Sequence, residues 1–399
     1  MIKEEFYKSS DIIRKFCKAM GVHFRVNRNI FEHFKNLWFY YWNFVWLNID
    51  VFGEFMFTAN GIMEGTDFVN VTYILPCTAI CLLGNLKTYQ TVAHSAQILD
   101  LMNSLENMKF HTEDHNVIQK AFDEILPKMH KALKTLKLSN IVTMINFGMN
   151  PILVMITIYY KTNQLELHQP FHIWYPFDAY NRITFPLVYL HQIYSAWVAL
   201  FTVYGPDCLY FVTSSFVGIQ FRLLQHEIRE LIPEEFTGTR DEVKDFYINL
   251  RRLVNWHLEI IRCVGLLETI FTKSTLYNAI SSSFLICLTG FNVTAIDHVP
   301  FVMTFLAFLV LTFLQIYFFC IFGDMITVLS SEVGDAVYNS RWYLINSTHK
   351  NCFRTQVPCK LTALGFADIN LKAFARILST SWSYFTLLKT MYSSPRNSS

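Results

Sequence analysis

The stretch TSWSYFTLL, residues 380–388, lies inside the last apolar segment of the chain, residues 370–392. This segment is long enough to cross the hydrocarbon core of a bilayer, which takes about 20 helical residues. On a helix, residues at three- or four-residue spacing share one face. Lys389 would lie about 200 degrees from Leu387 and point away from the face that Leu387 occupies. That face carries Thr380, Tyr384, Leu387 and Met391.

The composition extends this interpretation to the whole chain. Of 399 residues, 52% are hydrophobic and 16% are charged, whereas about a quarter are charged in an ordinary soluble domain. The mean hydropathy is +0.27. We therefore expect an all-α membrane protein forming a single domain over residues 1–399, with no linker, low-complexity block or internal repeat. Its seven expected spans are residues 37–57, 68–86, 138–160, 187–217, 269–295, 299–322 and 370–392.

The distribution of positive charge predicts the orientation of these spans. Residues 1–35 are rich in charge and lack a signal-peptide pattern, so we expect them to stay in the cytoplasm. With this segment inside, twenty-seven Lys and Arg residues fall on the cytoplasmic side and only three on the other. The positive-inside rule therefore places the N-terminus in the cytoplasm and the C-terminus outside. This orientation excludes a G-protein-coupled receptor, whose Asp-Arg-Tyr and Asn-Pro-x-x-Tyr motifs are also missing.

Helical patterns continue beyond the spans into the cytoplasmic segments. Residues 98–106, 116–138 and 244–267 have apolar residues at helical spacing. We expect them to extend the transmembrane helices and to form an anchor region in the cytosol. Around Asp297 the chain has almost no loop, and Pro300 suits the first turn of a helix. The fifth and sixth spans should therefore form an antiparallel hairpin.

Several motifs, in order along the chain, resemble those of the insect odorant receptors. WYPFD at 174–178 is similar to an element of the family's second extracellular loop, and His257 is similar to a single His in the long intracellular loop. Gln315 and Gly323 resemble a Gln and a Gly that occur in the sixth helix of the family. The C-terminal signature has Trp382 where the family commonly has tyrosine. It comprises Tyr338, Trp342, Pro358, LTALGF at 361–366, Phe374 and TSWSYFTLL.

This resemblance implies a chemosensory channel subunit in the plasma membrane of olfactory sensory neurons. Such a subunit binds small volatile odorants and, in a heterotetramer with the family's co-receptor, opens a non-selective cation channel. The segment 221–268 lacks the long insertion of the co-receptor, which indicates a ligand-tuning subunit. The implied partners are an odorant, a co-receptor and membrane lipid, with no nucleic acid. A gustatory receptor channel is the first alternative, followed by a metabotropic receptor and a transporter.

The resemblance also implies two sets of functional residues. Apolar side chains on the last helix would form the gate, because an apolar ring can stop ions by dewetting. The same residues could instead pack a helix bundle. The gate set is Tyr384, Leu387, Thr390 and Met391. The ligand set lies in the outer halves of the second, third, fourth and sixth spans, where aromatic residues also serve the core and face lipid. It is Thr72, Tyr73, Phe147, Asn150, Val154, Tyr194, Trp197, Met303 and Phe305.

Polar and reactive residues give no sign of catalysis. Cys77 and Cys81 lie one helical turn apart, but no second pair completes a zinc site. The chain has no metalloprotease, serine hydrolase or phosphate-binding motif. We therefore expect no enzyme activity, metal or cofactor. Asp50 and Glu54 share one face of the first span, and because an unpaired charge in lipid is costly, we expect them to pair within the protein.

Overall fold

The computed structural model describes residues 2–19, 30–65, 68–108, 114–296, 299–341, 343 and 358–393. Within these residues the regular structure is helical, apart from one isolated β-bridge between Thr362 and Asp368. The expected all-α fold is thereby confirmed. The helices are α1 (Ile2–Ala19), α2 (Ile30–Glu64), α3 (Phe68–Ala93), α4 (Ser95–Asn107), α5 (His115–Thr162), α6 (Phe185–Arg229), α7 (Arg240–Ala295), α8 (Val299–Asn339) and α9 (Leu371–Ser393).

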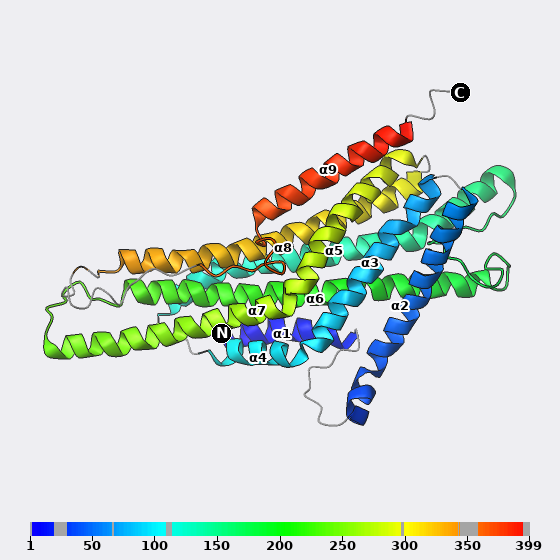
Figure 1. The fold of residues 1–399 in the computed structure, drawn as a ribbon. Helices are drawn as coiled ribbons and strands as arrows, with labels where there is room; N and C mark the ends of the chain where they lie inside the picture. Colours follow the sequence, from blue (N-terminus) through cyan, green and yellow to red (C-terminus); the bar gives the residue numbers. More distant parts are fainter. Residues whose placement is uncertain are drawn as a thin grey trace.

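The long helices form an elongated bundle. Helices α5 to α8 run along its length, α9 lies along one edge, and α2 crosses at an angle (Figure 1). The seven stretches expected to span the membrane fall in seven different helices, α2, α3 and α5 to α9. Only Asn370 falls outside its helix. It precedes α9, where its side-chain Oδ1 accepts a hydrogen bond from the Ala373 amide at 2.9 Å and so caps the first turn.

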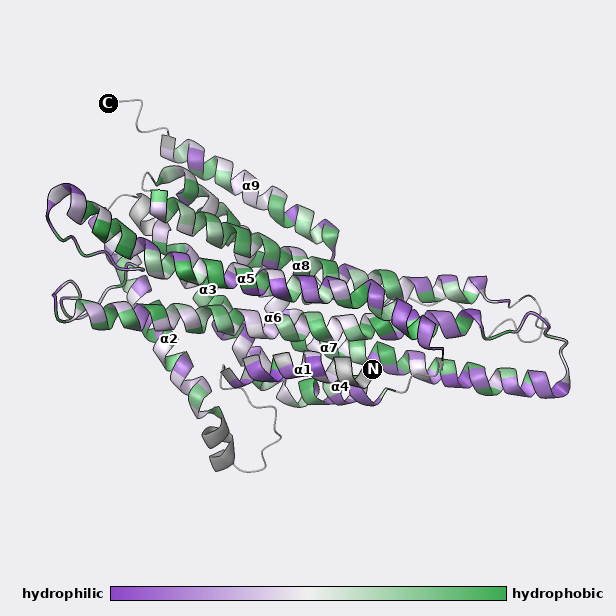
Figure 2. Cartoon of the chain, turned by 180° about the vertical axis from the view of Figure 1, so that it is seen from behind, coloured by the Kyte–Doolittle hydropathy of each residue, from purple (hydrophilic) through white to green (hydrophobic). Residues whose placement is uncertain are grey.

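Apolar character is unequal among these seven helices. Among the described residues, α5, α6, α7 and α8 are long and apolar enough to cross a membrane by length and composition. Hydrophobic residues dominate the part of the bundle near α9, whereas hydrophilic residues become frequent toward the opposite ends of α7 and α8 (Figure 2). The bundle therefore has an apolar half and a polar half.

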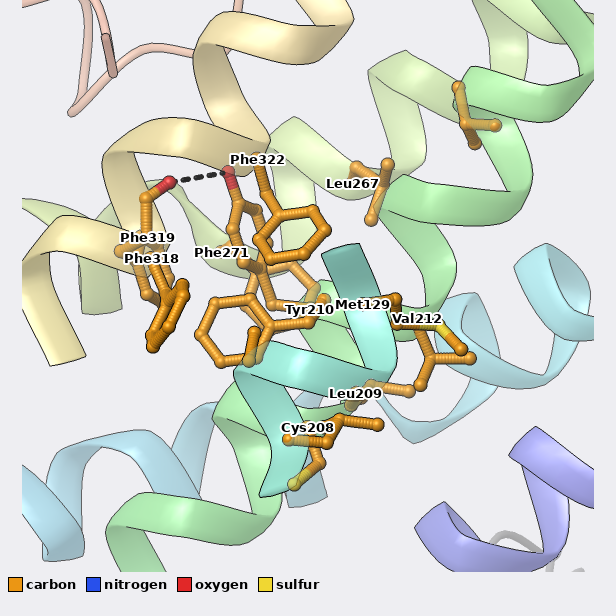
Figure 3. Close-up of a cluster of buried hydrophobic side chains, with 14 of the residues drawn as sticks. Met129, Cys208, Leu209, Tyr210, Val212, Leu267, Phe271, Phe318, Phe319 and Phe322 are labelled. Atoms are coloured by element: carbon orange, nitrogen blue, oxygen red, sulfur yellow. Dashed lines mark hydrogen bonds between the residues drawn. The ribbon is translucent and has the colours of Figure 1, made fainter. Parts of the chain in front are cut away.

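Helix α6 is the centre of the bundle. It contacts α1, α2, α3, α5, α7 and α8, and residues 202–221 are all buried. A helix that is buried on every side needs no polar face. Tyr210 of α6 stacks on Phe319 of α8 with ring centroids 4.1 Å apart, and Phe271 of α7 meets Tyr210 edge-on at 5.2 Å (Figure 3). These rings fix α7 and α8 against α6.

The polar half of the bundle is made by helical extensions, as the sequence predicts. Helix α7 has 56 residues and is about 84 Å long at 1.5 Å per residue, well beyond the thickness of a bilayer. Arg222 of α6 bridges Glu124 of α5, at 2.6 Å from Nη2 to Oε1, and Glu332 of α8. Arg262 of α7 binds Asp100 of α4 at 2.7 Å. Ion pairs thus join α5, α6 and α8 to one another, and α4 to α7, in this anchor region.

The LTALGF motif forms a tight reverse turn before α9. The Ile369 amide donates to the Leu361 carbonyl at 2.9 Å, and the turn has two residues with positive φ, Leu364 at 52° and Gly365 at 74°. Glycine tolerates this conformation at little cost. The turn docks on α7, where the Leu364 amide donates to Thr272 Oγ1 at 2.8 Å. This contact sets where α9 begins.

Candidate ligand cavity and exposed face of α9

A buried cavity of about 40 Å³ lies where five helices meet. All but one of its lining side chains are buried. We call it the central cavity. It is lined by Leu47, Asp50 and Glu54 of α2, Cys77, Ile80 and Cys81 of α3, Phe147 of α5, Ser195, Ala196, Ala199 and Leu200 of α6, Phe308 of α8, and Phe171 of the α5–α6 loop.

Two carboxyl groups in this otherwise apolar wall differ in their partners. The Oδ1 atom of Asp50 lies 3.1 Å from Nδ1 of His191 on α6. Trp46 stacks on the His191 ring with centroids 4.6 Å apart, which holds the imidazole beside the carboxyl. Glu54, only 3% exposed, has no ion-pair partner among the described residues, and its Oε2 atom accepts no hydrogen bond. Asp50 thus lies within ion-pairing distance of an imidazole, which is charged only when protonated, whereas Glu54 has no such neighbour among the described residues.

The loop between α5 and α6 covers the central cavity. Gln192 of α6 accepts a hydrogen bond from the Phe171 amide at 3.1 Å and donates one to its carbonyl at 3.2 Å. This pair of bonds holds the Phe171 ring against Phe147, with centroids 4.9 Å apart. The WYPFD element reaches α2, where the Trp174 amide donates to the Gly53 carbonyl at 3.1 Å. A Cβ at Gly53 would lie 2.8 Å from the Trp174 carbonyl, so this approach requires glycine.

Of the nine residues in the predicted ligand set, Phe147 lines the central cavity. Two others bind neighbouring helices. Thr72 of α3 and Asn292 of α7 form a reciprocal pair, with hydrogen bonds of 3.0 and 2.9 Å. Asn150 of α5 donates to Thr304 Oγ1 of α8 at 2.6 Å. These side chains already have partners, so they fix the helices around the cavity.

The remaining six occupy different environments. Tyr73 and Phe305 form a separate cluster with ring centroids 4.9 Å apart, which also includes His172. His172 lies in the loop, and burial, with a smaller effect of His168, lowers its pKa. The other four are spread over the bundle. Tyr194 donates to Asn43 Oδ1 of α2 at 2.8 Å, Val154 is buried, Trp197 lines a groove between α5 and α6, and Met303 is 51% exposed.

A buried ionic network joins three of the helices that line the cavity. Lys87 Nζ of α3 lies 2.6 Å from Asp207 Oδ1 of α6, and Gln315 Nε2 of α8 donates to Asp207 Oδ2 at 2.8 Å. Lys87 and Asp207 are each only 2% exposed. Gln315 was singled out in the sequence, and the structure gives it this role as a partner of a buried carboxylate.

Helix α9 has one face against the bundle and one face exposed. Phe385 packs over Gly290 of α7, and Tyr392 meets Phe291 with ring centroids 5.4 Å apart. On the opposite side, large apolar side chains remain exposed in the single chain, which is unusual unless another surface covers them. Thr390 is also exposed. The exposed face of α9 includes Tyr384 (58%), Leu387 (55%) and Met391 (65%).

Sequence reasoning missed most of the cavity wall. In the sequence, Asp50 and Glu54 are four residues apart, and so are Cys77 and Cys81. Only the packing of α2 on α3 shows that both pairs face one cavity. Ser195 and Phe308 had no sequence signal that separated them from other residues of α6 and α8. Phe171 lies in a loop outside the expected spans.

A bundle of seven long helices with a buried cavity and an exposed apolar helix face has the architecture of a membrane receptor or channel subunit. The family model described as 7tm Odorant receptor matches residues 67–382. The chain therefore belongs to the odorant receptor family. Odorant receptor 67c of Drosophila melanogaster is 25% identical over 370 residues, covering 88% of both chains. Putative odorant receptor 92a of the same species is 22% identical over 388 residues, covering 94% of this chain and 93% of that one.

Solved structures show the same fold. The olfactory receptor OR5 from Machilis hrabei in complex with eugenol superimposes with a TM-score of 0.81. The alignment covers 98% of this chain and 100% of that one at 15% identity. OR5 without the ligand gives a TM-score of 0.80. The likeness extends over essentially the whole chain, so the shared fold includes α2, α3 and α9 as well as α5 to α8.

Proposed function

We propose that the chain is a ligand-tuning subunit of an odorant-gated cation channel in the plasma membrane of olfactory sensory neurons. One observation carries this proposal: helix α8 lines the central cavity and also supports α9. Phe308 of α8 is part of the cavity wall, and about two and a half turns further on Tyr317 meets Phe374 of α9 with ring centroids 5.5 Å apart. A displacement of α8 at the cavity would therefore also move its contact with α9.

The gating step follows from this arrangement. A ligand that binds the central cavity more tightly in the open channel shifts the population toward that state. A displacement of α8 then moves Phe374 and the exposed face of α9. In the closed channel, Leu387 and Met391 present apolar surface that excludes water from the constriction, and Tyr384 and Thr390 lie on the adjoining surface.

The exposed face of α9 also supports a heteromeric assembly. One chain supplies one such helix, so a closed pore needs helices from neighbouring subunits. A co-receptor subunit is the proposed neighbour. The charge split of the sequence favours a cytoplasmic N-terminus and an outer C-terminus. An epitope at Ser399 should then stain intact cells, and one at Met1 only permeabilised cells; the reverse pattern would contradict this orientation.

The test of the proposed function is a recording of odorant-evoked cation current. Cells that express this chain with a co-receptor should respond to members of a broad odorant panel, and cells with either subunit alone should not. Phe147→Ala, which enlarges the central cavity, should shift sensitivity or ranking across the panel more than Met303→Ala, because Met303 is half exposed. A panel with no active odorant at confirmed surface expression would refute the proposal.

A further inference from the structure

We propose that the central cavity recognises a short-chain aliphatic amine, bound as its ammonium against Glu54. This inference rests on the proposed function and adds the chemical class of the ligand. Glu54 lines the cavity at 3% exposure, and its Oε2 atom has no hydrogen-bond partner. A carboxylate buried without a partner is costly, so a cation that enters the cavity gains a strong interaction there.

Glu54 is distinguished by the pairing of its neighbour. His191 Nδ1 lies 3.1 Å from Asp50 Oδ1 and, when protonated, provides that carboxyl with a cationic neighbour. Tyr175 of the covering loop lies near both carboxyls, the Thr78 hydroxyl lies near Glu54, and Cys77 and Cys81 face the cavity from α3. None of these groups supplies a fixed cation to Glu54. The Glu54 carboxyl therefore has no cationic partner within the protein and is available to a ligand that brings one.

A second and independent feature of the wall suits an ammonium. Ser195 of α6 lines the same cavity at 4% exposure, and its hydroxyl has no hydrogen-bond partner. An ammonium carries three N–H donors, and Glu54 Oε2 and Ser195 Oγ are acceptors for two of them. The rings of Phe147, Phe171 and Phe308 complete the wall, and aromatic faces attract cations through their quadrupole.

The size of the cavity limits the length of the amine. At about 40 Å³ it holds roughly three to four water-sized atoms, given about 10–15 Å³ for each. This matches a chain of three carbons and one nitrogen, such as propylamine. The alcohol of the same length, 1-propanol, fits the space equally well but carries no positive charge. A comparison of propylamine with 1-propanol therefore separates recognition of the charge from recognition of the shape.

The experiment compares propylamine with 1-propanol on cells that express the chain with its co-receptor, alongside the odorant panel. The wild-type channel should respond to propylamine at a concentration at least about 10-fold lower than to 1-propanol. Glu54→Gln should raise the half-maximal concentration for propylamine by about 10- to 100-fold, the value of a charge-assisted hydrogen bond. Responses to uncharged panel odorants should change much less.

Matched variants keep the test decisive. Glu64→Gln makes the same chemical change at an exposed position of α2 and should leave the preference for propylamine intact. If Glu54→Gln fails to reach the surface, Ser195→Ala should still weaken the propylamine response selectively. A wild-type channel that prefers 1-propanol, or a Glu54→Gln channel with an unchanged propylamine response, would overturn the inference. Responses to other odorants of the panel would in that case still support the proposed channel function. A channel that no odorant opens would overturn both.

Discussion

Removal of one charge from the buried ionic network is predicted to destabilise the bundle strongly. Lys87→Met leaves the carboxylate of Asp207 buried, at 2% exposure, with Gln315 as its remaining partner. Breaking a buried ion pair on one side typically costs about 3–5 kcal/mol, because the remaining charge is uncompensated. The apparent melting temperature of the purified chain in detergent should therefore fall clearly. Lys120→Met removes an exposed cation on α5 and should leave it nearly unchanged.

The double variant Lys87→Met with Asp207→Leu gives the sharper comparison. Replacing a buried ion pair by apolar residues of similar volume is often close to neutral, so the double variant should recover most of the loss. The amide of Gln315 would then lack its acceptor, which leaves a residual cost of about 1–3 kcal/mol. A single Lys87→Met variant as stable as the wild type would refute this reasoning. So would a double variant that melts below both single variants.

Two further variants test packing and electrostatics elsewhere. Gly323→Ala should destabilise the chain by about 1–3 kcal/mol, because a Cβ there would lie 2.4 Å from the Ile369 carbonyl. The control is Gly334→Ala on the same helix, where a Cβ meets nothing within 4 Å, so this variant should be neutral or slightly stabilising. Melting curves of the two variants measure the difference. Hydrogen bonding to Arg222 holds the pKa of Glu124 below its ordinary 4.5. The ion pair of Glu124 with Arg222 therefore stabilises the fold at neutral pH, and this stabilisation is lost as the pH falls through the lowered pKa of Glu124. Arg222→Met should be less stable than the wild type at pH 7, and its melting temperature should decline less between about pH 5 and pH 3; parallel declines would contradict this linkage.

The sequence predicts the helical architecture well because the relevant signals are local. Long apolar runs predict seven spans, each of which falls in a helix of its own. Helical periodicity over residues 244–267 predicts the extension that forms the N-terminal part of α7. The near absence of a loop before Pro300 predicts the hairpin of α7 and α8, which end and begin at Ala295 and Val299. The reverse turn in the C-terminal motif, where Leu364 and Gly365 have positive φ, is not predicted by these local signals.

The cavity wall depends on helix rotation, which the sequence does not encode simply. In a membrane bundle, apolar side chains face lipid as well as the core, so hydropathy alone does not separate Phe305, fully buried, from Met303, half exposed, two residues earlier. Asn150 has the chemistry of a ligand contact but is already bonded to Thr304 across the helix interface. Glu54 becomes part of the cavity only through the packing of α2 on α3 and α6.

The most direct test of the channel function is the basal current of a variant at the proposed gate. Leu387→Ser makes the exposed face of α9 more polar and should hydrate the closed constriction, which raises the ligand-independent current of the chain expressed with its co-receptor. Lys389→Gln, about 200 degrees away around the helix, should change the basal current much less at matched surface levels. Equal basal currents in the two variants would contradict the assignment of this face of α9 to the pore.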